Sequence, residues 1–250
     1  MQHIKFLSFL FFFAAVLQIQ TVFSQSVSPA EEKQRIIAYT KQKYGTDDIL
    51  VNGVLYVAEH YLAEGHPCLL TDEFSSGTVF IKDKKYGNEQ LKYDIEKDEF
   101  VLRAKTAGNS SKDIVLYSTL VDSIYFLNRR FVNARFIPTD EIEAGYYEMI
   151  YNNKQRKIYL FIDHYKNFKP DYTQNTPYGR YYETTSHRYL LLDKQLKKVN
   201  RKRNLLRAFA SHKRDIRKFI REHDIRYKKA TNFELTILMN YCNELSSNNN

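Results

Sequence analysis

The stretch that decides the fold class runs from residue 77 to residue 103 and reads GTVFIKDKKYGNEQLKYDIEKDEFVLR. It holds three short segments, at residues 77–82, 89–95 and 99–103, and charged turns separate them. Apolar and polar residues alternate within these segments, as they do in a strand that buries one face. The stretch therefore predicts three consecutive strands joined by turns.

The same pattern continues along most of the chain. We predict further strands at residues 114–117, 123–127, 134–137, 145–151, 156–163, 186–192 and 195–199. No helix of crossover length separates them, which excludes a parallel sheet and favours an antiparallel sandwich or barrel. Nearer the N-terminus, apolar runs on both sides of Asn52-Gly53 predict a β-hairpin.

Helices are predicted before and after this β region. Ser28-Pro29-Ala30-Glu31 is a capping box that opens a helix over residues 29–44. Apolar spacing predicts a second helix over residues 204–221, with Ser211 as an alternative start, and Thr231–Glu234 is a capping box for a third. The predicted fold class is α+β: a mainly antiparallel β meander with an N-terminal helix and a C-terminal helical hairpin.

The first residues have the features of a signal peptide. Lys5 precedes an apolar core at residues 6–17, and Val22 and Ser24 suit cleavage before Gln25. An uncleaved anchor is the alternative, but twelve helical residues rise only about 18 Å, which is less than the ~30 Å hydrocarbon core. The predicted organisation is a signal peptide (1–24), an N-terminal helix plus β body (25–199), a basic helical hairpin packed on that body (200–245) and a polar tail (246–250). We expect an exported protein, periplasmic, cell-surface or secreted, with no transmembrane segment after cleavage.

Two cysteines, Cys68 and Cys242, are the only ones in the chain. An exported protein can form disulfides, and sequence leaves their pairing open. Because no CxxC motif occurs, a cysteine zinc site and thiol redox chemistry lack support. We favour two buried, unpaired thiols.

Positive charge is concentrated in one region. The chain has a net charge of +9. Its composition of 43% hydrophobic and 27% charged residues is typical of a globular protein. Residues 194–229 contain fifteen Lys or Arg against three acidic residues, a net charge of +12, so the rest of the chain carries −3. Five of these cations fall on one side of the predicted helix: Arg203, Arg207, Arg214, Lys218 and Arg221.

Three interpretations of this cationic face are open. It is a solvated helix surface, or it contacts an anionic envelope component such as lipid headgroups, lipopolysaccharide or acidic glycan, or it binds nucleic acid. Export and the placement of Phe209 and Phe219 on the opposite, apolar side disfavour nucleic acid. An envelope protein is a further candidate partner.

The sequence offers little for catalysis. His60, Glu64 and His66 are the nearest approach to a metal site, but their spacing and the adjacent Gly65 and Pro67 favour ordinary loop residues. Asp94 and Asp98 are interpreted as turn residues. No GxSxG, SxxK, GxGxxG or P-loop motif occurs, so we expect no cofactor and no catalytic residue.

Tyrosines provide an alternative function. The chain has 20 Tyr and no Trp, and many of the tyrosines lie between residues 146 and 182. Tyrosine rings cover half-buried sheets, but on a rigid scaffold they also stack on sugar rings. The alternative to a non-enzymatic binding or scaffolding module is therefore a carbohydrate-binding, carbohydrate-active or hydrolytic protein with a site in loops 58–67 and 164–180.

Several short motifs resemble a family of exported, signal-peptide-bearing proteins of Bacteroidota. They are Asn52-Gly53 before Tyr56, Gly65-His66-Pro67, Gly77-Thr-Val, Tyr93-Asp94 with Asp98, Gly145-Tyr146-Tyr147 and the basic helical C-terminus over 194–245. The likeness covers most of the mature chain, although each motif is short. It implies the exported compartment and the β-rich architecture, and it implies no particular activity.

Overall fold

The computed structural model describes residues 28–82, 84–106 and 110–247. The chain divides into two compact units, residues 1–43 and 44–250. The predicted signal peptide and residues 248–250 of the predicted tail lie outside the described residues. None of the helices in the described ranges is both long and apolar enough to cross a membrane.

The first unit contains all but the last residue of the predicted N-terminal helix. Helix α2 spans Pro29–Tyr44, as predicted. The Ser28 backbone N–H donates to Glu31, and the Glu31 N–H donates to the Ser28 hydroxyl, at 2.9 and 3.2 Å. These two reciprocal bonds are those of a capping box, so the local sequence fixes where this helix begins.

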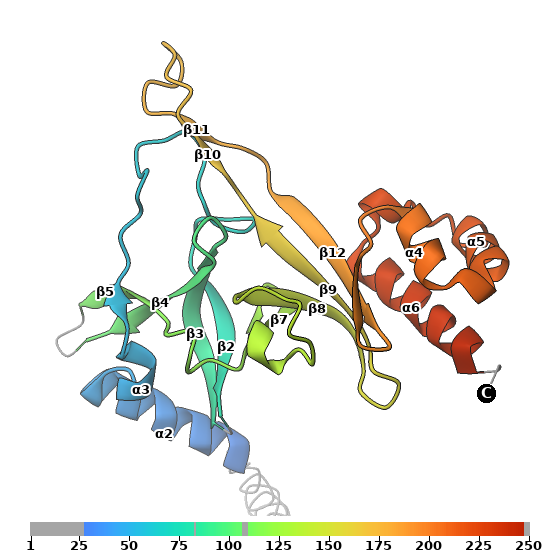
Figure 1. Ribbon diagram of the computed structural model, residues 1–250. Coiled ribbons are helices and arrows are strands. Elements are labelled where there is room, and N and C mark those ends of the chain that lie inside the picture. Colours follow the sequence, from blue (N-terminus) through green and yellow to red (C-terminus); the bar gives the residue numbers. More distant parts are fainter. Residues whose placement is uncertain (1–27, 83, 107–109, 248–250) are drawn as a thin grey trace, which may run out of the picture. The chain divides into compact units, whose positions relative to one another are not determined.

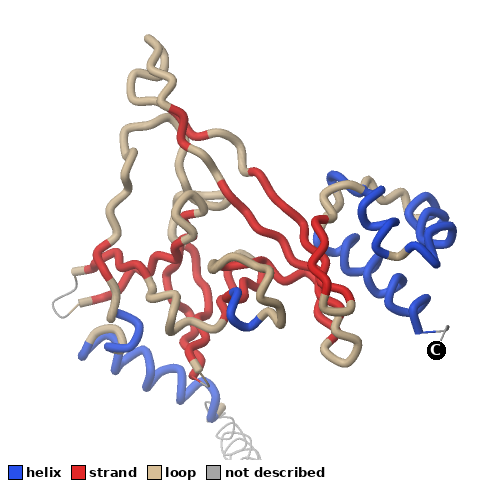
Figure 2. The backbone as a smooth tube through the Cα atoms, in the orientation of Figure 1, coloured by secondary structure: helices blue, strands red, loops and turns tan. Residues whose placement is uncertain are grey.

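One antiparallel sheet forms the body of the second unit (Figures 1 and 2). In the described residues it has eleven strands in the order β1-β5-β4-β3-β2-β6-β7-β8-β9-β12-β13. The strands are β1 Val54–Leu55, β2 Ser75–Ile81, β3 Lys84–Asp94, β4 Glu99–Lys105, β5 Ser111–Val115, β6 Ser123–Phe126, β7 Arg129–Asn133, β8 Tyr146–Asn153, β9 Ile158–Tyr165, β12 Thr185–Leu192 and β13 Gln195–Lys198. A separate two-stranded sheet joins β10 (Phe168–Lys169) to β11 (Arg180–Tyr181).

The α+β class and the antiparallel pairing are confirmed, but the sheet is open. It ends at β1 and at β13, so the described strands form neither the sandwich nor the barrel that we expected. Helices supply the layer that a second sheet would provide: Leu205, Ile216 and Leu235 pack with Ile162 and Leu190 of the sheet in one buried cluster. A second cluster around the other half of the sheet is rich in aromatic rings, including Tyr93, Phe100, Phe126 and Phe131.

The C-terminal helices follow the sheet (Figure 2). They are α4 Lys202–Ala208, α5 Lys213–Glu222 and α6 Asn232–Ser247, with 3₁₀ turns η2 Ala210–His212 and η3 Tyr227–Lys229 between them. The predicted helix over 204–221 is divided because Phe209 leaves the helical conformation, at φ −110° and ψ 55°. Ser211 does not restart it, since His212 is the N-cap of α5 and makes no side-chain capping bond.

Two local predictions were wrong. The segment before Asn52 is a short helix, α3 (Asp48–Val51), because the Asp47 carboxylate accepts from the Ile49 N–H and caps it. Asn52 itself has φ −76°, so it forms no hairpin turn, and β1 pairs with β5 instead. Gly53 is required there because a Cβ would overlap the Val115 carbonyl.

The second error lies at residues 134–137, predicted as a strand. Ala134–Phe136 is a 3₁₀ turn, η1, and the side chain of Asn133 accepts from the Arg135 N–H at its start. The strand in this region is β7, five residues earlier than predicted. Local side-chain capping therefore overrides the strand preference of these residues.

Candidate functional site

Two loops that lie about a hundred residues apart in the chain meet beside β10 and β11 (Figure 1). The Glu64 N–H donates to the Gly179 carbonyl at 3.0 Å, and the Tyr181 N–H donates to the Glu64 carbonyl at 2.9 Å. These bonds join loops 58–67 and 164–180, the two loops that the sequence analysis combined into one site. Gly179 permits the turn, because it has φ +77° and a Cβ there would meet the Phe168 ring at 2.5 Å.

An aromatic pocket of about 230 Å³ lies between the joined loops. The imidazole of His60 stacks on the ring of Phe168, with centroids 3.6 Å apart and planes 12° from parallel. Three exposed tyrosines surround this pair, and a carboxylate adds a polar group. We call the following residues the aromatic pocket: Glu59, His60, Tyr61, Phe168, Tyr172 and Tyr178. Ring faces next to polar groups suit the apolar faces and hydroxyls of a sugar.

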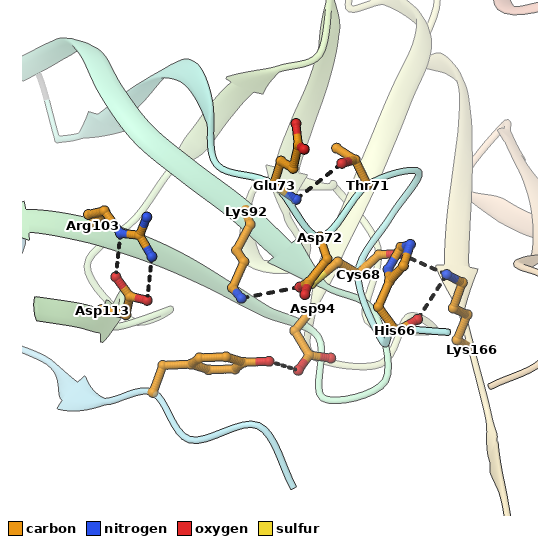
Figure 3. Close-up of polar contacts among 11 residues, drawn as sticks. His66, Cys68, Thr71, Asp72, Glu73, Lys92, Asp94, Arg103, Asp113 and Lys166 are labelled. Carbon is orange, nitrogen blue, oxygen red and sulfur yellow. Dashed lines mark hydrogen bonds and ion pairs between the residues drawn. The ribbon is translucent and has the colours of Figure 1, made fainter. Parts of the chain in front are cut away.

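The three weak metal candidates do not converge. His60 stacks in the aromatic pocket, and the Glu64 backbone bridges to Arg180. His66 lies apart, where its carbonyl accepts from Lys166 (Figure 3) and its buried Nδ1 has no hydrogen-bond partner among the described residues. The described part of the chain holds no group of three or more His, Cys, Asp or Glu side chains that could bind a metal ion.

A partly buried polar cluster holds both ends of loop 58–67 (Figure 3). At one end, the Tyr56 hydroxyl donates to Asp94 at 2.9 Å. At the other end, Lys166 Nζ donates to the carbonyls of His66 and Cys68 at 3.0 and 2.9 Å. Partial burial lowers the pKa of Lys166. The cluster therefore has a structural role: it positions the loop that carries the aromatic pocket.

The interpretation of Asp94 and Asp98 as turn residues needs one addition. Asp94 Oδ1 accepts from the N–H groups of Glu96 and Lys97, as a turn aspartate does. Asp98 adopts φ 55° in the same turn, but its carboxylate also binds the Tyr93 hydroxyl and the Tyr146 N–H. Burial raises the pKa of Asp98 to about 6. Asp98 therefore joins the turn after β3 to the start of β8.

The predicted cationic face is exposed, on two neighbouring helices rather than one. Arg203 and Arg207 lie on α4, and Arg214, Lys218 and Arg221 lie on α5. Lys218 is 3.7 Å from Glu222. Within the described residues the four arginines have no ion-pair partner. We keep the name cationic face for these five residues.

The apolar sides of these helices are buried as predicted. Phe209 is buried, and Phe219, which is partly buried, stacks on Tyr241 with ring centroids 4.1 Å apart. Aromatic rings from these positions therefore do not lie among the exposed cations.

A second group of cations forms a site that the sequence did not predict. Arg201, Lys202, Arg226, Lys228 and Lys229 line a pocket of about 700 Å³ between the end of β13 and η3. All five were counted in the +12 region, but helical spacing does not select them because they lie at helix ends and in a turn. The charge run was the signal, and only the tertiary structure shows that it surrounds a pocket.

Both cysteines are buried free thiols, so the preference for unpaired residues is confirmed. Cys68 Sγ lies 3.2 Å from the Asp72 carboxylate. Burial raises the pKa of both thiols, that of Cys242 to about 12. Neither sulfur is therefore a reactive thiolate at neutral pH.

Comparisons with models of known protein families, with curated proteins and with solved structures give no match for this chain. The resemblance to exported proteins of Bacteroidota therefore stays a prediction, and the function is argued from the sites themselves.

Proposed function

We propose that this protein is an exported, non-enzymatic binding module that attaches to an anionic component of the cell envelope through its cationic face. The observation that carries the proposal is the unpaired state of Arg203, Arg207, Arg214 and Arg221 among the described residues, all on exposed positions. Lipid headgroups, lipopolysaccharide and acidic glycan all carry the negative charge that this attachment requires.

The cationic face contributes little to folding. The helices are held by their other sides, where Leu205, Ile216 and Ile220 are buried, with Ile216 at 0% exposure. Like charges on one surface repel each other, so the fold gains nothing from collecting them there. An external anion would remove this repulsion, which supports a binding role over a purely solvated surface.

The expected strength of attachment is appreciable. Each Lys or Arg near an anionic surface contributes about 1 kcal/mol, and salt screens this over about 8 Å at physiological ionic strength. The four unpaired arginines acting together would give several kcal/mol at low salt. Binding should therefore weaken steeply as salt is raised.

The test compares two variants that each lose five positive charges. In the first, Arg203, Arg207, Arg214, Lys218 and Arg221 are changed to Gln. In the matched control, five exposed cations on the sheet and its turns are changed to Gln: Lys85, Lys105, Lys112, Lys154 and Arg156. Sedimentation with phosphatidylglycerol vesicles, lipopolysaccharide or acidic glycan measures retention.

We expect the face variant to lose most of its retention on at least one of these materials, and the control to keep it. Equal retention by the face variant and the wild type on all three would overturn the proposal. Equal losses in both variants would show that net charge, and not this surface, governs attachment, and would also overturn it.

A second candidate function is carbohydrate binding at the aromatic pocket. It is favoured by the convergence of loops 58–67 and 164–180 around the His60–Phe168 stack, with Tyr61 78% exposed. The test is glycan binding by the double variant Tyr172→Ala and Tyr178→Ala, with Tyr125→Ala on β6 as an exposed-tyrosine control. Loss of glycan binding in the double variant alone supports this function, and binding equal to wild type contradicts it.

A further inference from the structure

A second positively charged site lies close in the chain to the cationic face. We call it the basic pocket: it has a volume of about 700 Å³ and is lined by Arg201, Lys202, Arg226, Lys228 and Lys229. Ligand pockets for small molecules commonly measure about 300–1,000 Å³, so this one has room for a small ligand or one headgroup. None of its cations belongs to the cationic face.

Hydrogen bonds fix the two segments that form the basic pocket. The Tyr227 hydroxyl donates to the Val199 carbonyl at 2.6 Å, which ties η3 to the end of β13. Arg188 on β12 binds both sides: its N–H donates to Asn200 Oδ1 at 2.7 Å, and its guanidinium donates to the Tyr227 carbonyl. The backbone around the basic pocket is therefore organised before any ligand binds, which lowers the entropy lost on binding.

The charge of the basic pocket is uncompensated. Of its lining residues, five are Lys or Arg and none is acidic. All five are exposed, and in the described part of the chain none has an ion-pair partner. Five cations around one concave site repel each other, and a bound anion with more than one charge removes that repulsion.

The donor types define the class of anion. Arg201 and Arg226 offer planar guanidinium groups that can bind two oxygens at once, and Lys202, Lys228 and Lys229 offer point charges. This combination suits phosphate, which presents several oxygens and up to two charges per group. A carboxylate would use fewer of the donors.

We propose that the basic pocket binds a phosphomonoester or diphosphate group. This inference deepens and rests on the proposed function, because a phosphate site beside the cationic face would give the protein a preference for phosphorylated partners among anionic ones. The same chemistry occurs in a phosphorylated lipid headgroup and in a soluble phosphate, and the experiment separates these sources.

The experiment uses the full chain and two variants that each lose three charges. The pocket variant carries Arg226→Gln, Lys228→Gln and Lys229→Gln, and the face variant carries Arg207→Gln, Arg214→Gln and Lys218→Gln. Titration calorimetry with inorganic pyrophosphate at physiological salt measures the soluble arm. Vesicles containing phosphatidic acid or phosphatidylglycerol, matched in surface charge, measure the membrane arm. Circular dichroism checks folding, and Lys228→Gln with Lys229→Gln replaces the triple variant if that one is unfolded.

We expect saturable pyrophosphate binding whose Kd rises at least about tenfold in the pocket variant and less than about twofold in the face variant. No saturable binding by the wild type, or equal Kd values in the wild type and the pocket variant, would overturn the inference. If the pocket variant no longer prefers phosphatidic acid vesicles over phosphatidylglycerol vesicles, the ligand is a membrane lipid. If the pocket variant loses pyrophosphate binding but keeps the wild-type preference for phosphatidic acid vesicles, the ligand is a soluble phosphate.

The two proposals fail in different measurements. If the face variant sediments with both kinds of vesicle as the wild type does, surface attachment through the cationic face is wrong for lipid. The pyrophosphate titration then still decides whether the basic pocket is a phosphate site.

Discussion

Nε2 of His164 on β9 lies 2.6 Å from Oε2 of Glu148 on β8. The same carboxylate oxygen accepts from Nη1 of Arg129 on β7 at 2.8 Å, and the other oxygen accepts from Nδ2 of Asn232 at the start of α6. On the far side of the imidazole, Nδ1 lies 2.8 Å from the Ser186 hydroxyl on β12. One carboxylate and one imidazole therefore join four strands and a helix.

The order serine, imidazole, carboxylate also occurs in hydrolases. Here Glu148 is 1% exposed, and both of its oxygens are used to hold neighbouring elements together. We therefore interpret these residues as a structural clamp between the sheet and α6, and we call them the Glu148 clamp.

Removing the charge of the Glu148 clamp should destabilise the protein. Glu148→Gln leaves Arg129 without its ion-pair partner. Breaking a fully buried pair typically costs about 3–5 kcal/mol, and because the Arg129 side chain is 26% exposed we expect a loss near or below the lower end of that range. Urea unfolding measures the change. Asp113→Asn, which breaks the exposed pair with Arg103, is the control and should cost less than about 1 kcal/mol. Similar small losses in both variants would contradict the clamp.

The Glu148 clamp also predicts a loss of stability in acid. Burial alone would raise the pKa of Glu148, but the hydrogen bond and charge of His164, together with Arg129, outweigh it and hold the pKa below 4.5. A depressed pKa stabilises the folded state above the unfolded value, and this stabilisation is lost as pH falls through the folded pKa. Unfolding at a series of pH values below 5 should show a steeper decline in wild type than in Glu148→Gln.

Asp98 should have the opposite effect at higher pH. Its pKa is raised from 3.8 to about 6 by burial, so the folded state binds the proton more tightly than the unfolded state. Stability therefore decreases as pH rises from about 4 to about 6, by the order of 2 kcal/mol. Asp98→Asn should remove this slope, while Asp113→Asn should keep it. An unchanged slope in Asp98→Asn would show that another group is responsible.

Gly179 should be needed for the aromatic pocket. Gly179→Ala forces a side chain into φ +77° and against the Phe168 ring, so we expect a loss of about 1–3 kcal/mol or local opening of the joined loops. Limited proteolysis within residues 164–182 measures the opening. Gly87→Ala is the control, because a Cβ at Gly87 meets nothing within 4 Å. Equal protease resistance in both variants would mean that the loops tolerate the change.

The two thiols should be inert in the native protein. Cys68 and Cys242 are buried and carry raised pKa values, so iodoacetamide at mildly alkaline pH should modify neither. In concentrated guanidinium without reductant, both should react, adding two labels by mass spectrometry. Native labelling would contradict the buried state, and absence of labelling after unfolding would indicate a disulfide.

The sequence by itself determined the features that depend on neighbouring residues. The capping boxes at Ser28–Glu31 and Thr231–Glu234 start α2 and α6 as predicted, because their hydrogen bonds span only three residues. Most strands were also predicted from their alternation, since one buried face is enough to produce it. The local α+β pattern and the +12 region follow from sequence alone.

Only the tertiary structure decided which segments meet. Long-range contacts, which short sequence windows do not contain, decide three features: the pairing of β1 with β5, the division of the helix at Phe209 and the open eleven-stranded sheet of the described residues. The Glu148 clamp, the aromatic pocket and the basic pocket each combine residues from separate elements. Local hydrogen bonds and periodicity fix the elements, whereas burial and side-chain complementarity between distant elements fix the sites.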